Sequence, residues 1–439
     1  MLANQMADTA LLQTPADLTL PRTGSTTARR ILGTYLKWLT RELLQIPMGR
    51  FQAPVFDTFT DARSRLIGLL KTPKAGMVYA SLRRPSISVL VRCLHRELWG
   101  DGDVKVLDQM LGELGALLWL ELALADELPA GGVGLNHAPA VLYWAALGVT
   151  IERAADVSLG VREGELVLGN GPSGERVAFG ELAAIGDGSE PERCAESVRI
   201  KRAHFPLTQG ISLVAADNNP LSDQEAHPEK QGNAIDLGTR DASAWSRALG
   251  AAFATIELHY PELAEEMRLV MQSYHPVGYD AERHLSASYA EAIGAAYLSL
   301  HPDSMTLSEA LIHEFCHNKI NALFAADQLL ENAFEPLFSS PVRPDPRPLY
   351  GVLLAVHAFV PVAELYRRML ESGAPASGKP AFRARYEQIV AKNLDGIATL
   401  RRHGKPTPTG AWCLAELFAW ADAQSKPSVP PELAGAIPD

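Results

Sequence analysis

The chain has 439 residues, 47% of them hydrophobic, and a formal net charge of −11 at pH 7. This length and composition are typical of a soluble protein with a sizeable core and more than one compact region. The acidic balance argues against a nucleic acid as the main partner, because phosphate binding needs a basic surface.

The N-terminus predicts neither export nor a membrane anchor. Residues 1–27 lack a basic stretch followed by an apolar run, and their Thr, Pro, Gly and Ser content predicts a flexible arm. The most apolar window, 111–128, is interrupted by four carboxylates and therefore indicates a buried helix. The four cysteines form no CxxC pair, which favours reduced thiols. We expect a cytoplasmic protein with no membrane partner.

Residues 28–155 are predicted to form a mostly helical N-terminal region. Ile31, Tyr35 and Leu39 recur at helical spacing, and the segments 108–128 and 138–148 follow a similar pattern. The region contains no motif that carries chemistry. We therefore expect a scaffold or a substrate-binding lobe.

Residues 156–439 are predicted to form an α+β, metal-binding catalytic region. Alternating side chains around the glycine-rich turn 169–174 predict a hairpin, and 199–220 predicts further strands. The remaining predicted elements are, in chain order, a long helix over 242–272, a β-like segment over 284–301, a helix that carries the motif described next, and three helices near 348–373, 380–402 and 410–424.

The chain contains an HExxH motif at residues 313–317. On a helix, His313 and His317 lie on one face, so both imidazoles can bind one metal ion, and Glu314 beside them can act as general base on a metal-bound water. Thr306 and Glu309 predict a capping box that begins the helix about two turns before His313. A β-like segment directly before such a helix is the order found in zincin-like cores.

Two histidines need a third protein ligand. Glu331 and Glu335 would suit the gluzincin pattern, but they lie at a predicted helix end, and the residues after the motif lack the glycine and histidine of the metzincin pattern. His357 lies mid-helix among apolar residues and is the favoured candidate. Glu364 on the same helix is a further candidate ligand or ligand partner, and a glutamate in place of His357 remains open.

The sequence around the motif resembles a known family. "LIHEFCHNKINALF", followed by "RPDPRPLYGVLLAVHAFVPVAELYRR", is similar to the HExxH-motif domain proteins, part of which are 2-oxoglutarate-dependent HExxH-type peptide β-hydroxylases of ribosomal peptide biosynthesis. The matching features are HEFxHxKxNAL, the DPRP loop and the helix that follows it. The resemblance covers about 205–370.

The resemblance implies Fe(II) in place of zinc, with 2-oxoglutarate and O2 as cosubstrates. Its substrate would be a ribosomally made peptide, with or without a leader segment, hydroxylated at a β-carbon. His313 and His317 would be metal ligands, and His357 the third. Three protein ligands leave room on an octahedral ion for a bidentate 2-oxo acid and O2.

The distal carboxylate of 2-oxoglutarate needs a cation or hydroxyl groups. Arg347 in the DPRP loop is the leading candidate, because guanidinium binds carboxylates bidentately. A loop-bracing ion pair between Arg347 and Asp345 is the alternative interpretation. The lesser candidates are Arg343, Lys319, Ser286 and Ser288.

Three functions stay open at this point. The leading hypothesis is an Fe(II)/2-oxoglutarate-dependent peptide β-hydroxylase. The first alternative is a zinc metallopeptidase in which Glu314 is the general base, and the second is a non-catalytic peptide-binding protein that takes part in peptide maturation.

Overall fold

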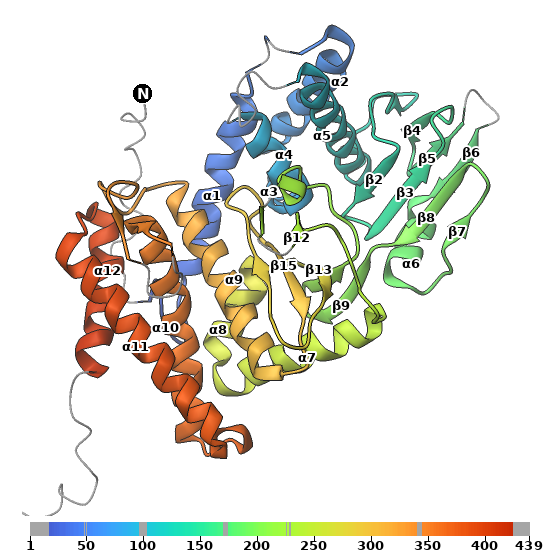
Figure 1. Ribbon diagram of the computed structural model, residues 1–439. Coiled ribbons are helices and arrows are strands. Elements are labelled where there is room, and N and C mark those ends of the chain that lie inside the picture. The colour runs from blue at the N-terminus through green and yellow to red at the C-terminus, as the bar shows by residue number, and fades with distance from the viewer. Residues whose placement is uncertain are drawn as a thin grey trace, which may run out of the picture. The chain divides into compact units, whose positions relative to one another are not determined.

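The computed structural model describes residues 17–47, 49, 51–95, 103–169, 174–224, 226–227, 230–339 and 345–424 (Figure 1). Helices and strands are mixed along this part of the chain, which confirms the predicted α+β class.

Packing divides the chain into two compact units. The terminal unit comprises Met1–Ile31, Thr255–Met267 and Leu323–Asp439, and the motif unit comprises Leu32–Ala254 and Arg268–Ala322. The two units interleave along the sequence, whereas the predicted regions 28–155 and 156–439 are contiguous. Those regions stay a prediction.

The prediction of a flexible arm over residues 1–27 is wrong for its described part, residues 17–27. Leu18 is 1% exposed, and the backbone N–H groups of Thr19 and Leu20 donate hydrogen bonds to the carboxylate of Glu416 at 2.8 and 2.9 Å. Burial of a large apolar side chain and a charged acceptor for two backbone donors fix this stretch. Residues 1–16 lie outside the described residues.

The first part of the chain is helical, as predicted, up to residue 124. Trp119 donates its indole N–H to the backbone carbonyl of Thr58 at 3.1 Å, which joins α5 to α2. The helices are α1 (Thr27–Leu44), α2 (Ala53–Gly68), α3 (Ala75–Arg83), α4 (Pro85–His95) and α5 (Val104–Leu124), with a short 3-10 turn η3 (Leu69–Lys71).

The prediction of a helix over 138–148 is wrong. This segment contains strand β2 (Val141–Trp144) and a turn that ends at Gly148, whose φ of 67° is in the left-handed region that favours glycine. Val, Tyr and Trp suit a strand, and the stretch is too short for its apolar spacing to distinguish helix from strand.

Two small antiparallel sheets follow α5. One has the strand order β2-β3-β8-β7 and the other β1-β4-β5-β6, in which β5 and β6 form the predicted hairpin. The strands are β1 (Val133–Gly134), β3 (Val149–Arg153), β4 (Leu159–Arg162), β5 (Glu165–Leu168), β6 (Glu175–Ala178), β7 (Arg193–Cys194) and β8 (Val198–Arg202), and α6 (Phe179–Asp187) follows β6.

The central sheet of the motif unit has the order β14-β15-β13-β10-β9. Its three inner strands are parallel, and both edge strands run antiparallel to their neighbours. The strands are β9 (His204–Thr208), β10 (Ile211–Val214), β13 (Ser273–Tyr279), β14 (Ser286–Ala287) and β15 (Ala295–Leu300); a 3-10 turn η4 (Ser222–Gln224) and a two-stranded ribbon of β11 (Ala226–His227) and β12 (Lys230–Gln231) lie between β10 and β13 in sequence.

The predicted long helix over 242–272 is two helices, α7 (Ala242–His259) and α8 (Pro261–Val270). Pro261 has no backbone N–H to continue α7, and its fixed φ suits the first position of a new helix.

The motif lies on α9 (Ser304–Phe324), as predicted, but the predicted capping box is wrong. The backbone N–H of Thr306 donates to the carboxylate of Asp303 at 2.8 Å, so Asp303 caps the helix and Thr306 is already inside its first turn.

Asn318 fastens α9 to the central sheet. Its side-chain oxygen accepts from the N–H of Gly294 at 2.6 Å, and its side-chain nitrogen donates to the carbonyls of Ala295 at 3.2 Å and Glu314 at 2.8 Å. Gly294 has a φ of 100°, and an added Cβ would lie 3.1 Å from the carbonyl oxygen of Val270. A fully buried amide therefore sets the position of the helix against the start of β15.

The three predicted C-terminal helices are confirmed and belong to the terminal unit. They are α10 (Leu349–Glu371), α11 (Pro380–His403) and α12 (Pro408–Gln424), accompanied by β16 (Leu337–Phe338), β17 (Arg347–Pro348) and η5 (Pro375–Gly378). Within the part of the chain that the structure describes, α10 alone is long and apolar enough to cross a membrane, and 72% of its apolar window is buried in the protein. Such burial is what the core helix of a soluble protein shows.

We expect Asn318→Ala to lower the free energy of unfolding by about 2–4 kcal/mol, because the N–H of Gly294 and the carbonyl of Ala295 would remain buried without a partner. Urea denaturation followed by tryptophan fluorescence measures this change. Gln388→Ala, on the exposed side of α11, is the control and should change stability by less than about 0.5 kcal/mol. Equal effects of the two variants would contradict the fastening role of Asn318.

Candidate metal centre

The imidazoles of His313 and His317 lie side by side on α9. Their ring centroids are 4.2 Å apart, and their side chains are 21% and 22% exposed. One helical turn separates the two residues, so the same face of α9 carries both rings. This arrangement gives two nitrogen donors that are accessible from one side.

Glu314 lies between the two histidines and is almost completely buried. Its Oε1 is 4.0 Å from Nε2 of His313, and its Oε2 is 3.9 Å from Nδ1 of His317. The hydroxyl of Ser286, on the edge strand β14, donates a hydrogen bond to Oε1 at 2.7 Å. The edge strand thus holds the carboxylate in place.

These residues fit a divalent transition-metal ion. One donor atom each from His313, Glu314 and His317 lie within 4.8 Å of one another. The two imidazoles are therefore close enough to share one ion, with the carboxylate of Glu314 beside it. Imidazole and carboxylate donors suit iron and zinc alike, so the set does not identify the metal.

The electrostatic environment favours the neutral, metal-binding form of His313. Burial lowers the pKa of His313 below its usual value, and the negative charges of Glu314 and Glu309 oppose this shift. A neutral imidazole has a lone pair available for a metal at pH 7.

Ser288, one of the residues predicted to bind 2-oxoglutarate, lies in the motif unit. It follows β14, and its buried hydroxyl has no hydrogen-bond partner among the described residues. Of the lesser candidates, Ser286 is engaged by Glu314, and Lys319 on α9 is only 2% exposed.

The other predicted site residues belong to the terminal unit, and their roles stay predictions. His357 lies on α10, is 2% exposed, and has its Nε2 3.3 Å from the carbonyl oxygen of Leu18. Arg347 forms an ion pair with Asp345 at 2.8 Å, which is the loop-bracing contact that the sequence offered as the alternative. Arg343 lies outside the described residues.

The glutamates considered as alternative third ligands are either paired with arginines or exposed. Both carboxylate oxygens of Glu364 accept hydrogen bonds from Arg367, and one of them also accepts from Arg368, at distances of 2.7 to 2.8 Å. Glu331 and Glu335 are exposed in the irregular segment after α9, which already ends at Phe324, so the prediction that they lie at a helix end is wrong. Glu364 therefore braces α10 within the terminal unit.

Sequence reasoning missed three contributions within the motif unit. It did not pair Ser286 with Glu314, it gave no role to His284, and it overlooked Tyr274 on β13. Burial, together with His301 and His313, lowers the pKa of His284 to about 4, so a neutral third imidazole lies within electrostatic range of His313. Burial and the negative charge of Glu314 raise the pKa of Tyr274. His284 and His301, which flank the β-like segment before the motif, were the sequence signal for further histidines near the site.

No protein-family model matches this sequence, and no curated protein matches it either. The resemblance to HExxH-type hydroxylases therefore rests on the quoted motifs alone.

We expect the metal-free protein to bind one equivalent of Co(II), and His313→Ala or His317→Ala to weaken this binding by about 100-fold or more, because each variant removes a ligand. Ser286→Ala should weaken it by roughly 10-fold, because Glu314 would lose its fixed orientation. Equilibrium dialysis measures the Co(II) affinity of the unaltered protein and of the three variants. His403→Ala, at an exposed position, is the control and should bind Co(II) as the unaltered protein does. Unchanged affinity in both ligand variants would exclude this site.

The same titration separates two candidates for the third ligand. If His357 is the third ligand, as predicted, His357→Ala binds Co(II) more weakly than the unaltered protein and His284→Ala binds it equally well. The reverse pattern would assign the third position to His284, within the motif unit.

Proposed function

We propose that this protein is an Fe(II)/2-oxoglutarate-dependent oxygenase that hydroxylates a β-carbon in a ribosomally made peptide in the cytoplasm. The reaction converts a peptide C–H bond, O2 and 2-oxoglutarate into a C–OH bond, succinate and CO2. One oxygen atom enters the peptide and the other enters succinate. The partner is the peptide itself, with or without a leader segment, and neither a nucleic acid nor a membrane is needed.

The observation that carries the proposal is the environment of Glu314 between the two partly buried imidazoles of His313 and His317. Its side chain is 2% exposed, and the hydroxyl of Ser286 occupies one carboxylate oxygen. A metallopeptidase needs this carboxylate to take a proton from a metal-bound water. The proposed oxygenase needs no such base, so a carboxylate fixed by Ser286 is compatible with it. The motifs shared with the HExxH-type hydroxylases supply the choice of iron and 2-oxoglutarate.

The arrangement of the motif unit also supports a zincin-like core. The motif helix α9 follows the parallel strand β15 and is fastened to it by Asn318, and the antiparallel edge strand β14 lies next to β15. This strand-then-helix order is the one expected from the sequence.

Each residue has a defined task under this proposal. His313 and His317 would hold the iron, with His357 as the predicted third ligand, and Arg347, Arg343 and Ser288 would bind the distal carboxylate of 2-oxoglutarate. When bound, iron and 2-oxoglutarate together supply the oxidation of the C–H bond by O2. Glu314, buried between the imidazoles, keeps them oriented and contributes negative charge beside the cation.

We expect the protein to form succinate from 2-oxoglutarate in the presence of Fe(II) and O2, even without its peptide, at a slow uncoupled rate. His313→Ala should abolish this activity, and the exposed His403→Ala should retain it. Chromatography of the 2-oxo acid and its product measures the rate.

Glu314→Gln separates the oxygenase from the zinc peptidase. The amide keeps the size of the side chain and removes the base, so an oxygenase should keep succinate formation within about 10-fold, whereas a peptidase should lose hydrolysis by about 100-fold or more. Zinc-dependent cleavage of peptides that disappears in Glu314→Gln, with no succinate formed by the unaltered protein, would contradict the proposal.

A further inference from the structure

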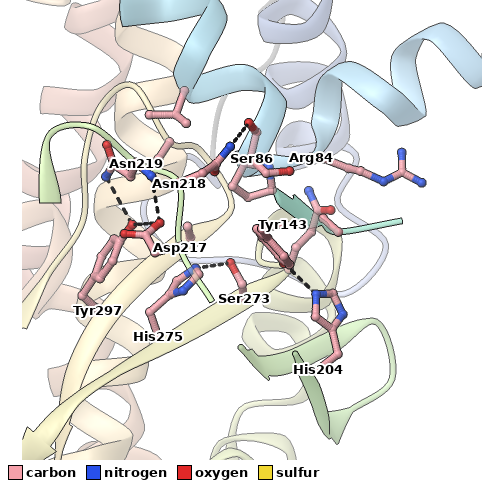
Figure 2. A pocket seen from close by; sticks show the side chains of 16 residues that line it. Arg84, Ser86, Tyr143, His204, Asp217, Asn218, Asn219, Ser273, His275 and Tyr297 are labelled. Atoms are coloured by element: carbon pink, nitrogen blue, oxygen red, sulfur yellow. Dashed lines mark hydrogen bonds between the residues drawn. The ribbon is translucent and has the colours of Figure 1, made fainter. Parts of the chain in front are cut away.

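The motif unit contains a second polar site, a cavity of about 60 Å³ (Figure 2). Its walls come from the α3–α4 junction, from β2, from the start of β9, from the loop after β10, and from the neighbouring strands β13 and β15. A volume of 60 Å³ holds about four water molecules, or one amino group with the carbon atoms attached to it. No residue of the HExxH motif lines it.

The central sheet separates this cavity from the motif. His275 is in register with Tyr297, and both line the cavity, as do Ser273 and Ala295. Side chains alternate between the two faces of a strand, so Tyr274 lies on the opposite face, where the charge of Glu314 acts on it. The cavity and the candidate metal centre therefore use different faces of the same strands.

Asp217 is the centre of the polar network in the cavity. Its Oδ1 accepts hydrogen bonds from the hydroxyl of Tyr297 at 2.9 Å and from the backbone N–H of Asn219 at 3.0 Å. The side-chain amide of Asn219 donates to the same tyrosine hydroxyl at 3.2 Å. Figure 2 shows this cluster beside the stacked ring of His275. The network thus orients the carboxylate of Asp217 rigidly.

Two buried oxygen atoms of the cavity lining have no hydrogen-bond partner among the described residues. They are Oδ2 of Asp217 and Oγ of Ser86, and the Ser86 residue is only 4% exposed. A buried carboxylate oxygen or hydroxyl without a partner is costly, so a ligand that donates hydrogen bonds would stabilise both.

The charges around the cavity favour a cation. Arg84 at the rim is paired with Glu121 at 3.0 Å, and the two lining histidines, His204 and His275, have pKa values lowered by burial. These histidines are therefore neutral at pH 7. Because Arg84, which also lines the cavity, is already paired with Glu121, the negative charge of Asp217 has no unpaired cation beside it in the described lining. Ca²⁺ or Mg²⁺ is a poor fit, because these ions prefer about six oxygen ligands with several carboxylates, and Asp217 is the one carboxylate residue in the described lining.

We propose that this cavity binds a primary ammonium group, with Asp217 Oδ2 as its charged acceptor and Ser86 Oγ as its second acceptor. An ammonium group offers three N–H donors in a compact volume. The rings of Tyr297 and His275 cover the attached carbon atoms. The group comes from the amino terminus of a peptide or from a free small amine, and both share this chemistry. The proposal does not depend on the proposed oxygenase activity.

The test is ligand-detected NMR with the full chain and four probes. Methylamine and triglycine carry a primary ammonium group, acetamide carries only neutral N–H donors, and tetramethylammonium carries charge without N–H donors. We expect saturable binding of methylamine or triglycine at millimolar concentration, and no binding of the other two probes. Saturation by triglycine identifies a peptide amino terminus as the source, and saturation by methylamine alone identifies a free amine.

Two variants and a control assign the binding to this cavity. Asp217→Asn keeps the size of the side chain and removes its charge, and should weaken ammonium binding by at least about 10-fold. Ser86→Ala should weaken it a few-fold, and Asp57→Asn, on the exposed face of α2, should leave it unchanged. Circular dichroism verifies that each variant is folded. Equal binding of the unaltered protein and a folded Asp217→Asn would overturn the proposal, as would binding of none of the ammonium probes.

Discussion

The seating of α9 on the central sheet is the constraint on which the candidate metal centre depends. Two polar contacts fasten it: Asn318 bonds to the start of β15, and Glu314 accepts the hydroxyl of Ser286 from the edge strand β14. The contacts of Asn318 are buried and that of Ser286 is partly buried, which strengthens each hydrogen bond relative to one in water. They fix the rotation of α9 about its axis, and this rotation decides which face carries His313 and His317.

One sheet serves two chemically different sites. The side of β13 and β15 that faces α9 carries Tyr274, whose pKa responds to Glu314, and the other side carries His275 and Tyr297, which line the cavity around Asp217. The alternation of side chains along a strand allows this division. The candidate metal centre and the proposed amine-binding carboxylate therefore share a scaffold without sharing residues.

Local patterns were sufficient to predict much of the fold. Helical spacing predicted α1, α5 and the three C-terminal helices, and alternation predicted the β5–β6 hairpin, because both signals lie within a short stretch of chain. The histidine pair was predictable for the same reason. The errors have local causes too: β2 is too short for its spacing to be decisive, and Asp303 offers a better cap than Thr306.

Contacts between distant segments could not be predicted. Ser286 and Glu314 are 28 residues apart, and Asn219 and Tyr297 are 78 residues apart, so no spacing rule joins them. Nothing in the sequence shows that a short edge strand delivers a hydroxyl to the motif glutamate. The cavity around Asp217 is assembled from six separate stretches, and none of its residues stands out in the sequence when considered one at a time.

The central claim is that the imidazole pair holds an iron ion together with a 2-oxo acid. The most direct measurement is the visible spectrum of the metal-free protein under anaerobic conditions, first with Fe(II) and then with 2-oxoglutarate. The account predicts a weak charge-transfer band that needs both additions and is lost in His313→Ala. Absence of the band in a protein that retains tightly bound zinc would contradict the account and favour peptide hydrolysis with Glu314 as the base.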